Sequence, residues 1–280
     1  MPIRTIIFNS THCVNPTGDK NEYRYVFRGG GLELSPDKKH SIAVTNITIP
    51  YSMFNISENY NNKFFQLIIN GTTYNINVPS SYMDVSDLNK YLQWWFINQN
   101  IGYCYDQFQN YKYFMELEYN VSRYAVEVIF YPMVLSPGDT LPPGMNAATF
   151  NGNTMQIVIP SNNFGKLLGL TPGTYPQTVQ TTTTSVISNM TVEGSPINAL
   201  NLCCSLVNND ISNTPDSFYS WTPTGTFGSN LILQPPEMVF IACNSGRYQQ
   251  ITLTIKDQEN RNIQMRDSTI CISLALKTED

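Results

Sequence analysis

Apolar and polar residues alternate over short runs along most of the chain, with the period of two that half-buried β-strands show. The runs are rich in β-branched and aromatic residues and are separated by Gly, Pro, Asn and Asp. The stretch "FFQLIINGTTYNINVP" predicts a hairpin, because Asn70-Gly71 suits a turn whose two central residues take positive φ. The pattern therefore predicts a chain dominated by antiparallel β-structure.

The period changes to three and four residues in "DVSDLNKYLQWWFINQN". Apolar side chains recur there at Val85, Leu88, Leu92, Trp95 and Phe96. This spacing places them on one side of an amphipathic helix, for which either Asp84 or Ser86 can serve as the N-cap.

A second, much shorter helical pattern occurs in "SNNFGKLLGLTPGTY". Phe164, Leu167 and Leu168 fall on one side of a helical turn that is too short to be stable alone. Gly169 suits the left-handed conformation that ends a helix, and Pro172 prevents continuation. We expect the turn to be docked, so that Phe164, Leu167, Leu168 and Gly169 close the end of a sheet module. The turn lacks the converging polar groups of a ligand site.

The threonine-rich segment Thr171 to Ser185 is low in apolar residues and predicts a connector between two modules. Outside Tyr51 to Thr184 the alternation predicts eight strands, three before and five after: Ile3 to Phe8, Glu22 to Arg28, Ser41 to Ile49, Ser185 to Met190, Ile197 to Val207, Glu237 to Cys243, Arg247 to Asp257 and Ile263 to Leu276. The stretch from Asn208 to Gln234 is expected to be a loop.

Eight antiparallel strands are the number of a jelly roll. We therefore predict an all-β fold, a single antiparallel jelly-roll β-sandwich built from residues 1–50 and 185–280. Residues 51–184 are predicted to form an inserted β-rich module with two short helices, in the order hairpin, helix, strands and short terminal helix. A chain of 280 residues is long enough for one such domain with an insertion.

Composition points to contact with other protein. Charged residues make up 13% of the chain, about half the usual share, while aromatic residues reach 12%. The net charge is −5 with a pI of about 5.1, and Lys and Arg are scattered, so we expect no direct nucleic-acid partner.

The N-terminus "MPIRTIIFNS" has too short an apolar stretch for a signal peptide, and no run reaches the ~18 apolar residues of a membrane span. We therefore expect synthesis in the cytosol or nucleus and no membrane insertion.

Triplets of the form N-x-S/T begin at Asn9, Asn46, Asn55, Asn70, Asn120 and Asn189. Without a secretory signal we interpret them as a consequence of frequent Asn and Thr rather than as glycosylation sites.

No catalytic, metal or cofactor site is predicted, and we expect the chain not to be an enzyme. The six cysteines are scattered without a C-x-x-C pair, so free thiols are expected. His12 and His40 lack metal-ligand spacing and are expected in exposed loops. No nucleophile elbow, Walker motif or Rossmann glycine pattern occurs.

Two other function classes have candidate residues. Glu116, Glu118 and Glu127 on adjacent predicted strands could supply the paired acids of a glycosidase, although a solvated outer face explains them more simply. Trp94, Trp95 and Trp221 are candidate sugar-stacking side chains of a lectin-like binding module. Because helical neighbours lie about 100° apart, at most one of the first two joins the apolar side.

Several stretches resemble one family when taken in order. "NFGKLLGL" after "IVIP", and "DVSDLNKYL" after "YNINVPSSY", are similar to the inserted module in the minor capsid, or penton, proteins of virophages, Polinton (Maverick) elements and adintoviruses. "SIAVTNITIPYSMFNIS" resembles the strand and Tyr-x-x-x-Asn turn before that module. "SNLILQPPEMVFIAC" and "ITLTIKDQENRNIQMRDSTICISLAL" resemble its closing strands and hairpin.

This resemblance spans about Ser41 to Leu276, and its polar turn contains Asp257, Asn260 and Arg261. Asn260 stands where the family often has Gly, so we expect only the turn type to differ. No Arg-Gly-Asp motif is present, so the sequence gives no support for receptor binding through such an integrin motif.

The resemblance implies a structural protein of the virion, assembled in the host cytoplasm or nucleus. Such a protein forms a homopentamer at the fivefold vertices of an icosahedral capsid and is surrounded by a double-jelly-roll major capsid protein. It uses no cofactor. The alternative is a jelly-roll module that binds a carbohydrate or receptor, and a carbohydrate-active enzyme ranks third. The surfaces between subunits and any host receptor stay open.

Overall fold

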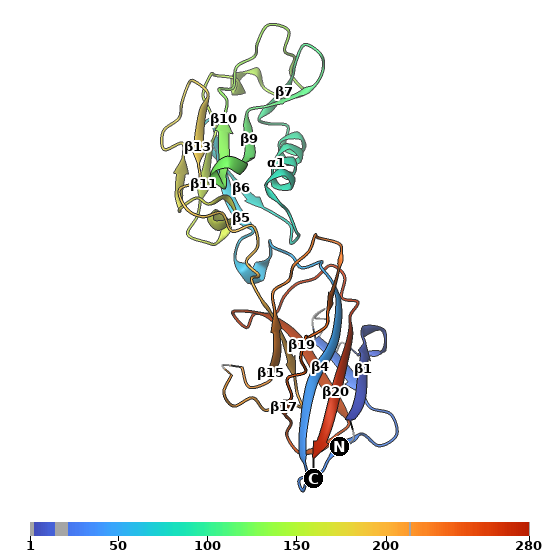
Figure 1. Ribbon diagram of the computed structural model, residues 1–280. Coiled ribbons are helices and arrows are strands. Elements are labelled where there is room, and N and C mark those ends of the chain that lie inside the picture. Colours follow the sequence, from blue (N-terminus) through green and yellow to red (C-terminus); the bar gives the residue numbers. More distant parts are fainter. Residues whose placement is uncertain (1–2, 15–21, 213, 280) are drawn as a thin grey trace. The chain divides into compact units, whose positions relative to one another are not determined.

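The computed structural model describes residues 3–14, 22–212 and 214–279. The chain divides into two compact units (Figure 1). The first unit combines Met1–Phe54 with Ile197–Asp280, and the inserted unit is Asn55–Pro196.

Two antiparallel sheets form the first unit. Its strands are β1 (Ile3–Asn9), β2 (Glu22–Val26), β3 (Leu32–Leu34), β4 (Lys39–Pro50), β14 (Leu200–Cys204), β15 (Ser217–Trp221), β16 (Asn230–Leu233), β17 (Ile241–Ala242), β18 (Gly246–Tyr248), β19 (Gln250–Asp257) and β20 (Cys271–Glu279). One sheet has the order β1-β20-β4-β16, with β17 also paired to β4, and the other has the order β15-β14-β19-β2. The short strands β3 and β18 form a separate pair.

The pairing within these sheets is that of a jelly roll. In chain order the eight main strands are β1, β2, β4, β14, β15, β16, β19 and β20. The first pairs with the eighth, the second with the seventh, the third with the sixth and the fourth with the fifth. A long antiparallel hairpin rolled into two facing sheets gives this order. The prediction of an all-β jelly roll is confirmed.

Alternating side chains explain why the two sheets face each other. In β19, Ile251, Leu253 and Ile255 are buried, whereas the threonines between them lie on the outer side. Phe8 of β1 is fully buried and contacts Tyr25 of β2, edge to face at 5.2 Å, so this contact joins the two sheets. The apolar side of each sheet is thus removed from water against the other.

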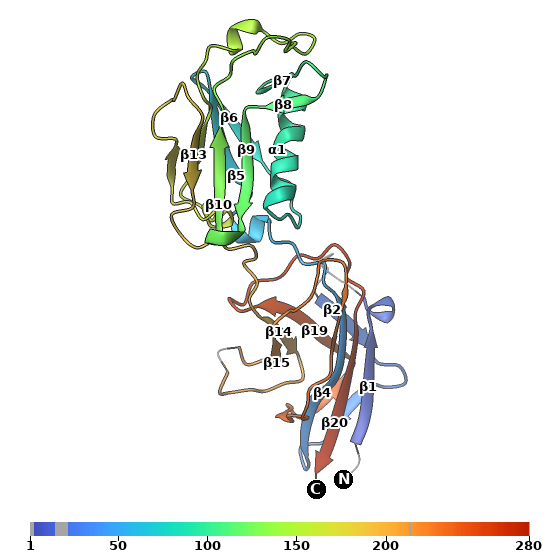
Figure 2. The ribbon, with the colours of Figure 1, turned by 45° about the horizontal axis from the view of Figure 1, so that its top comes forward.

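The inserted unit contains two sheets, a hairpin and two helices (Figure 2). Its elements are β5 (Phe64–Ile69), β6 (Thr72–Asn77), α1 (Val85–Gln99), β7 (Tyr103–Tyr105), β8 (Tyr111–Tyr113), β9 (Met115–Asn120), β10 (Ala125–Phe130), β11 (Gln156–Ile159), α2 (Phe164–Leu168), β12 (Gly173–Tyr175) and β13 (Thr184–Ile187). The sheet orders are β12-β11-β5-β6 and β13-β10-β9, and β7 pairs with β8. Asn70 and Gly71 connect β5 and β6 with positive φ, as predicted.

Helix α1 covers the free edge of β9. Its N-cap is Asp84, whose carboxylate accepts a hydrogen bond from the Asp87 N–H at 2.8 Å. Asn89 Oδ1 accepts from the Leu117 N–H of β9 at 2.9 Å, which satisfies a backbone donor at the sheet edge. The predicted apolar side faces the core, where Leu88, Leu92, Trp95 and Phe96 are buried. No helix in the described part of the chain is both long and apolar enough to cross a bilayer.

The boundary after the insertion differs from the predicted one. Thr184–Ile187 pairs with β10 of the inserted unit, and β12 within the threonine-rich segment pairs with β11. The insertion therefore continues to Pro196 rather than ending at Thr184, and it begins at Asn55 rather than Tyr51. The predicted strand Ser185 to Met190 was wrongly assigned to the jelly roll, because its pattern fits either sheet equally well.

Two more strand assignments were wrong. The stretch Asn208 to Gln234, predicted as a loop, contains β15 and β16, which complete the two sheets. Glu237 to Cys243, predicted as a strand, contributes only the two-residue β17. The predicted number of eight thus matches the eight main strands of the jelly roll, although two of the predicted members are not among them.

Asp257 organises the turn that follows β19. The residue is fully buried, and its carboxylate accepts hydrogen bonds from the N–H groups of Glu259 and Arg261, both at 2.9 Å, and from Arg261 Nε at 2.7 Å. Asn260 adopts a left-handed conformation with φ of 62°, which Gly and Asn adopt at least cost. Asn260 therefore adopts a left-handed backbone conformation that Gly would also adopt.

Replacement of Asp257 by Ala should destabilise the first unit by about 3 kcal/mol, because it removes the buried acceptor of two backbone N–H groups and of Arg261 Nε. Faster hydrogen exchange in β14 and β19 would report this loss. Glu259→Ala is the matched control, since Glu259 pairs with Arg261 from an exposed position and should cost less than about 1 kcal/mol. Equal effects of the two substitutions would contradict the assigned role of Asp257.

Candidate functional site

Helix α2 is docked into the core of the inserted unit. Phe164 is fully buried and stacks on Phe65 of β5, with ring centroids 4.5 Å apart and planes within 14°. Leu167 and Leu168 are also buried. All three predicted apolar residues of this turn therefore lie in the core, and a five-residue helix owes its stability to that burial.

Two asparagine side chains fix the start of α2 to the incoming chain. Asn162 Nδ2 donates to the Phe64 carbonyl at 2.9 Å, and Asn163 Nδ2 donates to the Tyr60 carbonyl at 2.8 Å. Asn162 Oδ1 also accepts from the Phe164 N–H at 2.9 Å, so it satisfies one of the free donors at the helix start.

Two glycines allow the backbone to pack closely around α2. A Cβ at Gly165 would lie 2.3 Å from the Leu170 carbonyl oxygen, so only Gly fits there. Gly169 has φ of 65° and ends the helix in the left-handed conformation, as predicted. A Cβ at Gly169 would lie 2.6 Å from the Met190 carbonyl oxygen.

The outgoing chain satisfies the carbonyl groups at the end of α2. The Gly169 carbonyl accepts from the N–H groups of Asn189 and Met190, at 2.9 and 3.0 Å. The Glu193 N–H donates to the Lys166 carbonyl at 2.8 Å, and Ser188 Oγ lies 2.8 Å from the Leu168 carbonyl oxygen. Helix α2 is therefore bonded to both the incoming and the outgoing segments of the inserted unit.

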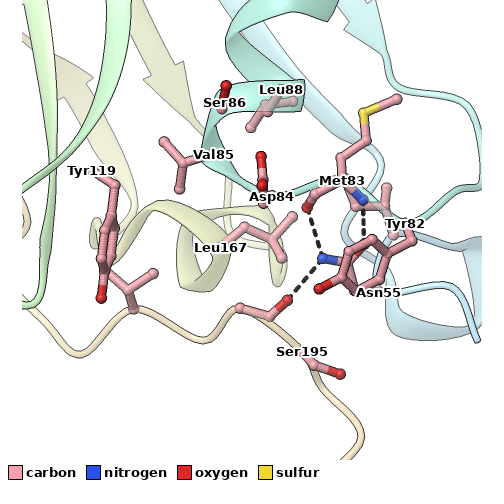
Figure 3. A pocket seen from close by; sticks show the side chains of 13 residues that line it. Asn55, Tyr82, Met83, Asp84, Val85, Ser86, Leu88, Tyr119, Leu167 and Ser195 are labelled. Carbon is pink, nitrogen blue, oxygen red and sulfur yellow. Dashed lines mark hydrogen bonds between the residues drawn. The ribbon is translucent and has the colours of Figure 1, made fainter. Parts of the chain in front are cut away.

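Asn55 makes a second connection between these segments (Figure 3). It is 2% exposed, and its Nδ2 donates to the carbonyls of Met83 and Gly194 at 2.8 and 2.7 Å. Its Oδ1 accepts from the Met83 N–H at 2.9 Å. One side chain thus joins the first residue of the unit, the segment before α1 and the outgoing chain. Sequence reasoning named Asn55 only in the Tyr-x-x-x-Asn turn and in a glycosylation triplet, because no local pattern shows an amide's burial.

A cavity of about 390 Å³ lies beside Asn55, between the start of α1 and the outgoing chain (Figure 3). Its lining is mainly apolar, with Val85, Leu88 and Leu167 among the side chains. The Asp84 carboxylate at its rim already caps α1. The cavity therefore offers apolar packing, and the Asp84 carboxylate in its lining is engaged in the fold.

The residues considered for catalysis do not converge. His12 lies exposed after β1, but His40 was wrongly expected in an exposed loop. It lies buried in β4, with Nε2 3.1 Å from the Ser35 carbonyl oxygen and Nδ1 3.1 Å from Thr278 Oγ1. Both ring nitrogens are thus occupied by structural contacts.

The three glutamates lie on neighbouring strands, where Glu118 and Glu127 are directly opposite each other. Glu116 accepts a hydrogen bond from the Tyr131 hydroxyl at 3.1 Å. Burial, followed by the charge of Glu116, raises the pKa of Tyr131. Glu116 therefore acts as the hydrogen-bond partner of Tyr131.

The tryptophans do not form a common platform. Trp95 is buried against Phe96, whereas Trp94 is 56% exposed and stacks on Tyr91. The prediction that one of the two joins the apolar side is confirmed. Trp221 is buried in β15 of the first unit.

Among the described residues, no group of three or more His, Cys, Asp and Glu side chains is placed to hold a metal ion. The six cysteines are free thiols. Burial raises the pKa of Cys204 to about 12, so this thiol stays protonated at neutral pH.

The outer face of the β1-β20-β4-β16 sheet is the candidate interaction surface. Residues paired in register share a face, and its exposed or half-buried central positions are uncharged: Thr5, Ile7, Asn46, Thr48, Ile232 and Ser273. Ala43 and Ala275 on the same side are already buried within the chain. Ile7 and Ile232, on the two flanking strands, are 61% and 67% exposed. Charged side chains gather at one end of the face, where Lys277 pairs with Glu279. We call this surface the outer sheet face.

Comparison with solved structures gives a remote likeness. No protein-family model matches the chain, and no curated protein matches it. Among solved structures, the crystal structure of the SeMet-labelled mavirus penton protein aligns with a TM-score of 0.47 and 9% identity, over 99% of this chain and 99% of that chain. A likeness of this degree assigns neither fold nor function to the present chain.

Replacement of Leu168 by Asp should place an unpaired charge in the core of the inserted unit and destabilise it by about 4 kcal/mol. Limited proteolysis of the whole chain should then show new cleavage within residues 55–196. Lys166→Ala, on the exposed side of α2, is the matched control and should leave the cleavage pattern unchanged. An unaltered pattern for Leu168→Asp would show that α2 does not close this unit.

Replacement of Asn55 by Asp should destabilise the inserted unit by about 3 kcal/mol. A carboxylate oxygen would then stand in place of Nδ2, which donates to two carbonyl oxygens. Thermal unfolding of the purified chain would measure the change. Asn75→Asp is a matched control, because exposed Asn75 only accepts a hydrogen bond from Gln66, which a carboxylate also does. A loss no larger than in this control would exclude Asn55 as a bridging residue.

Proposed function

We propose that the chain is a structural protein of a viral capsid, the penton that occupies the fivefold vertices of an icosahedral shell as a homopentamer. Its partners are further copies of itself and a double-jelly-roll major capsid protein. It belongs to the virion, is assembled in the host cytoplasm or nucleus, and performs no catalysis. The sequence segments that resemble penton proteins of virophages, Polintons and adintoviruses first suggest this function.

The outer sheet face is the structural observation that carries the proposal. The outer side of a solvated antiparallel sheet ordinarily carries polar and charged side chains. Here the half-buried central positions are the uncharged Asn46, Thr48 and Ser273, and Ile7 and Ile232 are exposed on the flanking strands. Depletion of charged residues marks the core of an interface, and association would remove the two exposed isoleucines from water. We assign this face to contact with a neighbouring subunit.

A ring of five identical subunits places further demands on the surface. Each contact joins two different patches, because rotation about the fivefold axis brings one side of a subunit against the other side of its neighbour. The outer sheet face supplies one patch. Exposed Met238 and Val239, in the loop between β16 and β17, belong to the same unit and are candidates for the second.

Native mass spectrometry of the purified chain, with negative-stain images of the same sample, tests the proposal and should show a ring of five subunits. Ile7→Glu and Ile232→Glu should each weaken the ring by about 3 kcal/mol per contact, because the new carboxylate would be buried without a partner. Val121→Glu is the control, since Val121 is 71% exposed on the inserted unit.

A closed ring of another order would contradict the pentamer. If the chain is a monomer, the test is repeated on capsids assembled together with the major capsid protein. Absence of the chain from their vertices would refute the proposal. Equal weakening by Val121→Glu would exclude the outer sheet face as the specific contact.

A further inference from the structure

The β7–β8 hairpin of the inserted unit presents four tyrosines on one face. Tyr103 lies opposite Tyr113 and Tyr105 lies opposite Tyr111, and each of the four rings contacts at least two of the others. The rings of Tyr111 and Tyr113 are parallel within 12°, and Tyr111 is 49% exposed. The hairpin follows the end of α1 (Figure 2). Alternating tyrosines in "YCY" and "YKY" are the sequence signal of this face.

The hairpin turn is held rigid by Asp106. Its Oδ1 accepts hydrogen bonds from the N–H groups of Phe108 and Asn110, both at 2.8 Å, and its Oδ2 accepts from Asn110 Nδ2 at 3.2 Å. These hydrogen bonds, that of the Asn110 N–H above all, lower the pKa of Asp106. The turn is therefore formed without any ligand, which reduces the entropy lost on binding.

A second wall is fixed across from the hairpin. Lys112 Nζ donates to Ser136 Oγ at 3.1 Å and to Asp139 Oδ2 at 2.8 Å, and this ion pair lowers the pKa of Asp139. The Tyr131 N–H donates to the Phe114 carbonyl at 3.0 Å. A cleft of about 530 Å³ lies between the two walls, within the roughly 300–1,000 Å³ of ligand sites. We call it the tyrosine cleft, lined by Tyr111, Lys112, Tyr113, Glu116, Tyr131 and Ser136.

The lining combines an aromatic surface with both kinds of hydrogen-bonding group. Glu116 uses Oε2 to accept from Tyr131, which leaves its second oxygen to accept from a ligand. Lys112 is a donor, and the Ser136 hydroxyl can donate or accept. The exposed ring of Tyr111 offers an apolar face beside them.

We propose that the tyrosine cleft binds a neutral saccharide unit of a glycan. The C–H face of a pyranose packs on an aromatic ring, while its hydroxyl groups both donate and accept hydrogen bonds. Glu116 would accept from a hydroxyl, Lys112 and Ser136 would donate, and Tyr111 would carry the apolar face. The site lies wholly within the inserted unit, and binding there does not depend on the capsid function proposed above.

Charge selects against other ligands. The positive charge of Lys112 is balanced by Asp139, so Asp106 and Glu116 leave the cleft acidic and unfavourable to sialylated, sulfated or phosphorylated groups. An apolar ligand would leave Glu116 desolvated without a partner. A cationic ligand would find one carboxylate available, because both oxygens of Asp106 are occupied.

The test applies the full chain to a printed array of neutral, sialylated and sulfated glycans, followed by calorimetric titration of the neutral glycan with the strongest signal. Tyr111→Ala should weaken binding at least tenfold by removing the aromatic surface. Glu116→Gln, which keeps the size of the side chain, should also weaken it at least tenfold by removing the charge that strengthens the hydrogen bond.

Trp94→Ala is the matched control, because it removes another exposed aromatic side chain of the same unit and should leave the affinity unchanged. Circular dichroism of each variant verifies folding. Binding of no glycan, binding of sialylated or sulfated glycans only, or loss of binding in Trp94→Ala alone would each overturn the proposal. Retained pentamers without glycan binding, or glycan binding by a monomer, would separate this inference from the capsid function.

Discussion

The buried amide of Asn55 is the interaction on which closure of the inserted unit depends. It joins the start of the unit, the segment before α1 and the outgoing chain, through partners that are all backbone groups. A buried amide stabilises a fold when its donors and acceptor are satisfied, and it is costly when one is lost. Helix α2 repeats this arrangement, because its start is bonded to the incoming chain and its end to the outgoing chain. In the inserted unit, both the incoming and the outgoing segments are fixed by hydrogen bonds within the unit.

The first unit shows why low charge and a stable jelly roll are compatible. Its sheets bury apolar side chains between them by strict alternation, as β19 illustrates. The same alternation sets the composition of the outer sheet face, where Asn46, Thr48 and Ser273 occupy positions that solvated sheets give to charged residues. The absence of charge at these positions contributes to the chain's low charged content of 13%.

The aromatic surplus of the chain has a separate structural basis. Part of it lies in the core, where Phe65 stacks on Phe164, and part forms the ring cluster of the β7–β8 hairpin. The hairpin is too short to be stable alone, so the Asp106 turn and the Lys112–Asp139 ion pair hold it in place. Glu116 was a candidate catalytic acid from the sequence. In the structure it accepts a hydrogen bond from the hydroxyl of Tyr131 and is not paired with a second acid.

The sequence by itself determined the local elements: the Asn70-Gly71 turn, α1, and α2 with its Gly169 terminus, each of which depends on residues within a few positions. For the N-cap of α1 it left Asp84 and Ser86 open, and the structure has Asp84. It also determined the alternation that makes the fold all-β. Only the tertiary structure decided that Thr184–Ile187 joins the inserted unit, that β15 and β16 complete the jelly roll, and that His40 and Asn55 are buried. The tyrosine cleft likewise needs Tyr131 beside Glu116. The physical reason is that strand pairing and burial depend on partners far away in the chain, and an alternating pattern shows that a strand has two faces without showing which sheet it joins.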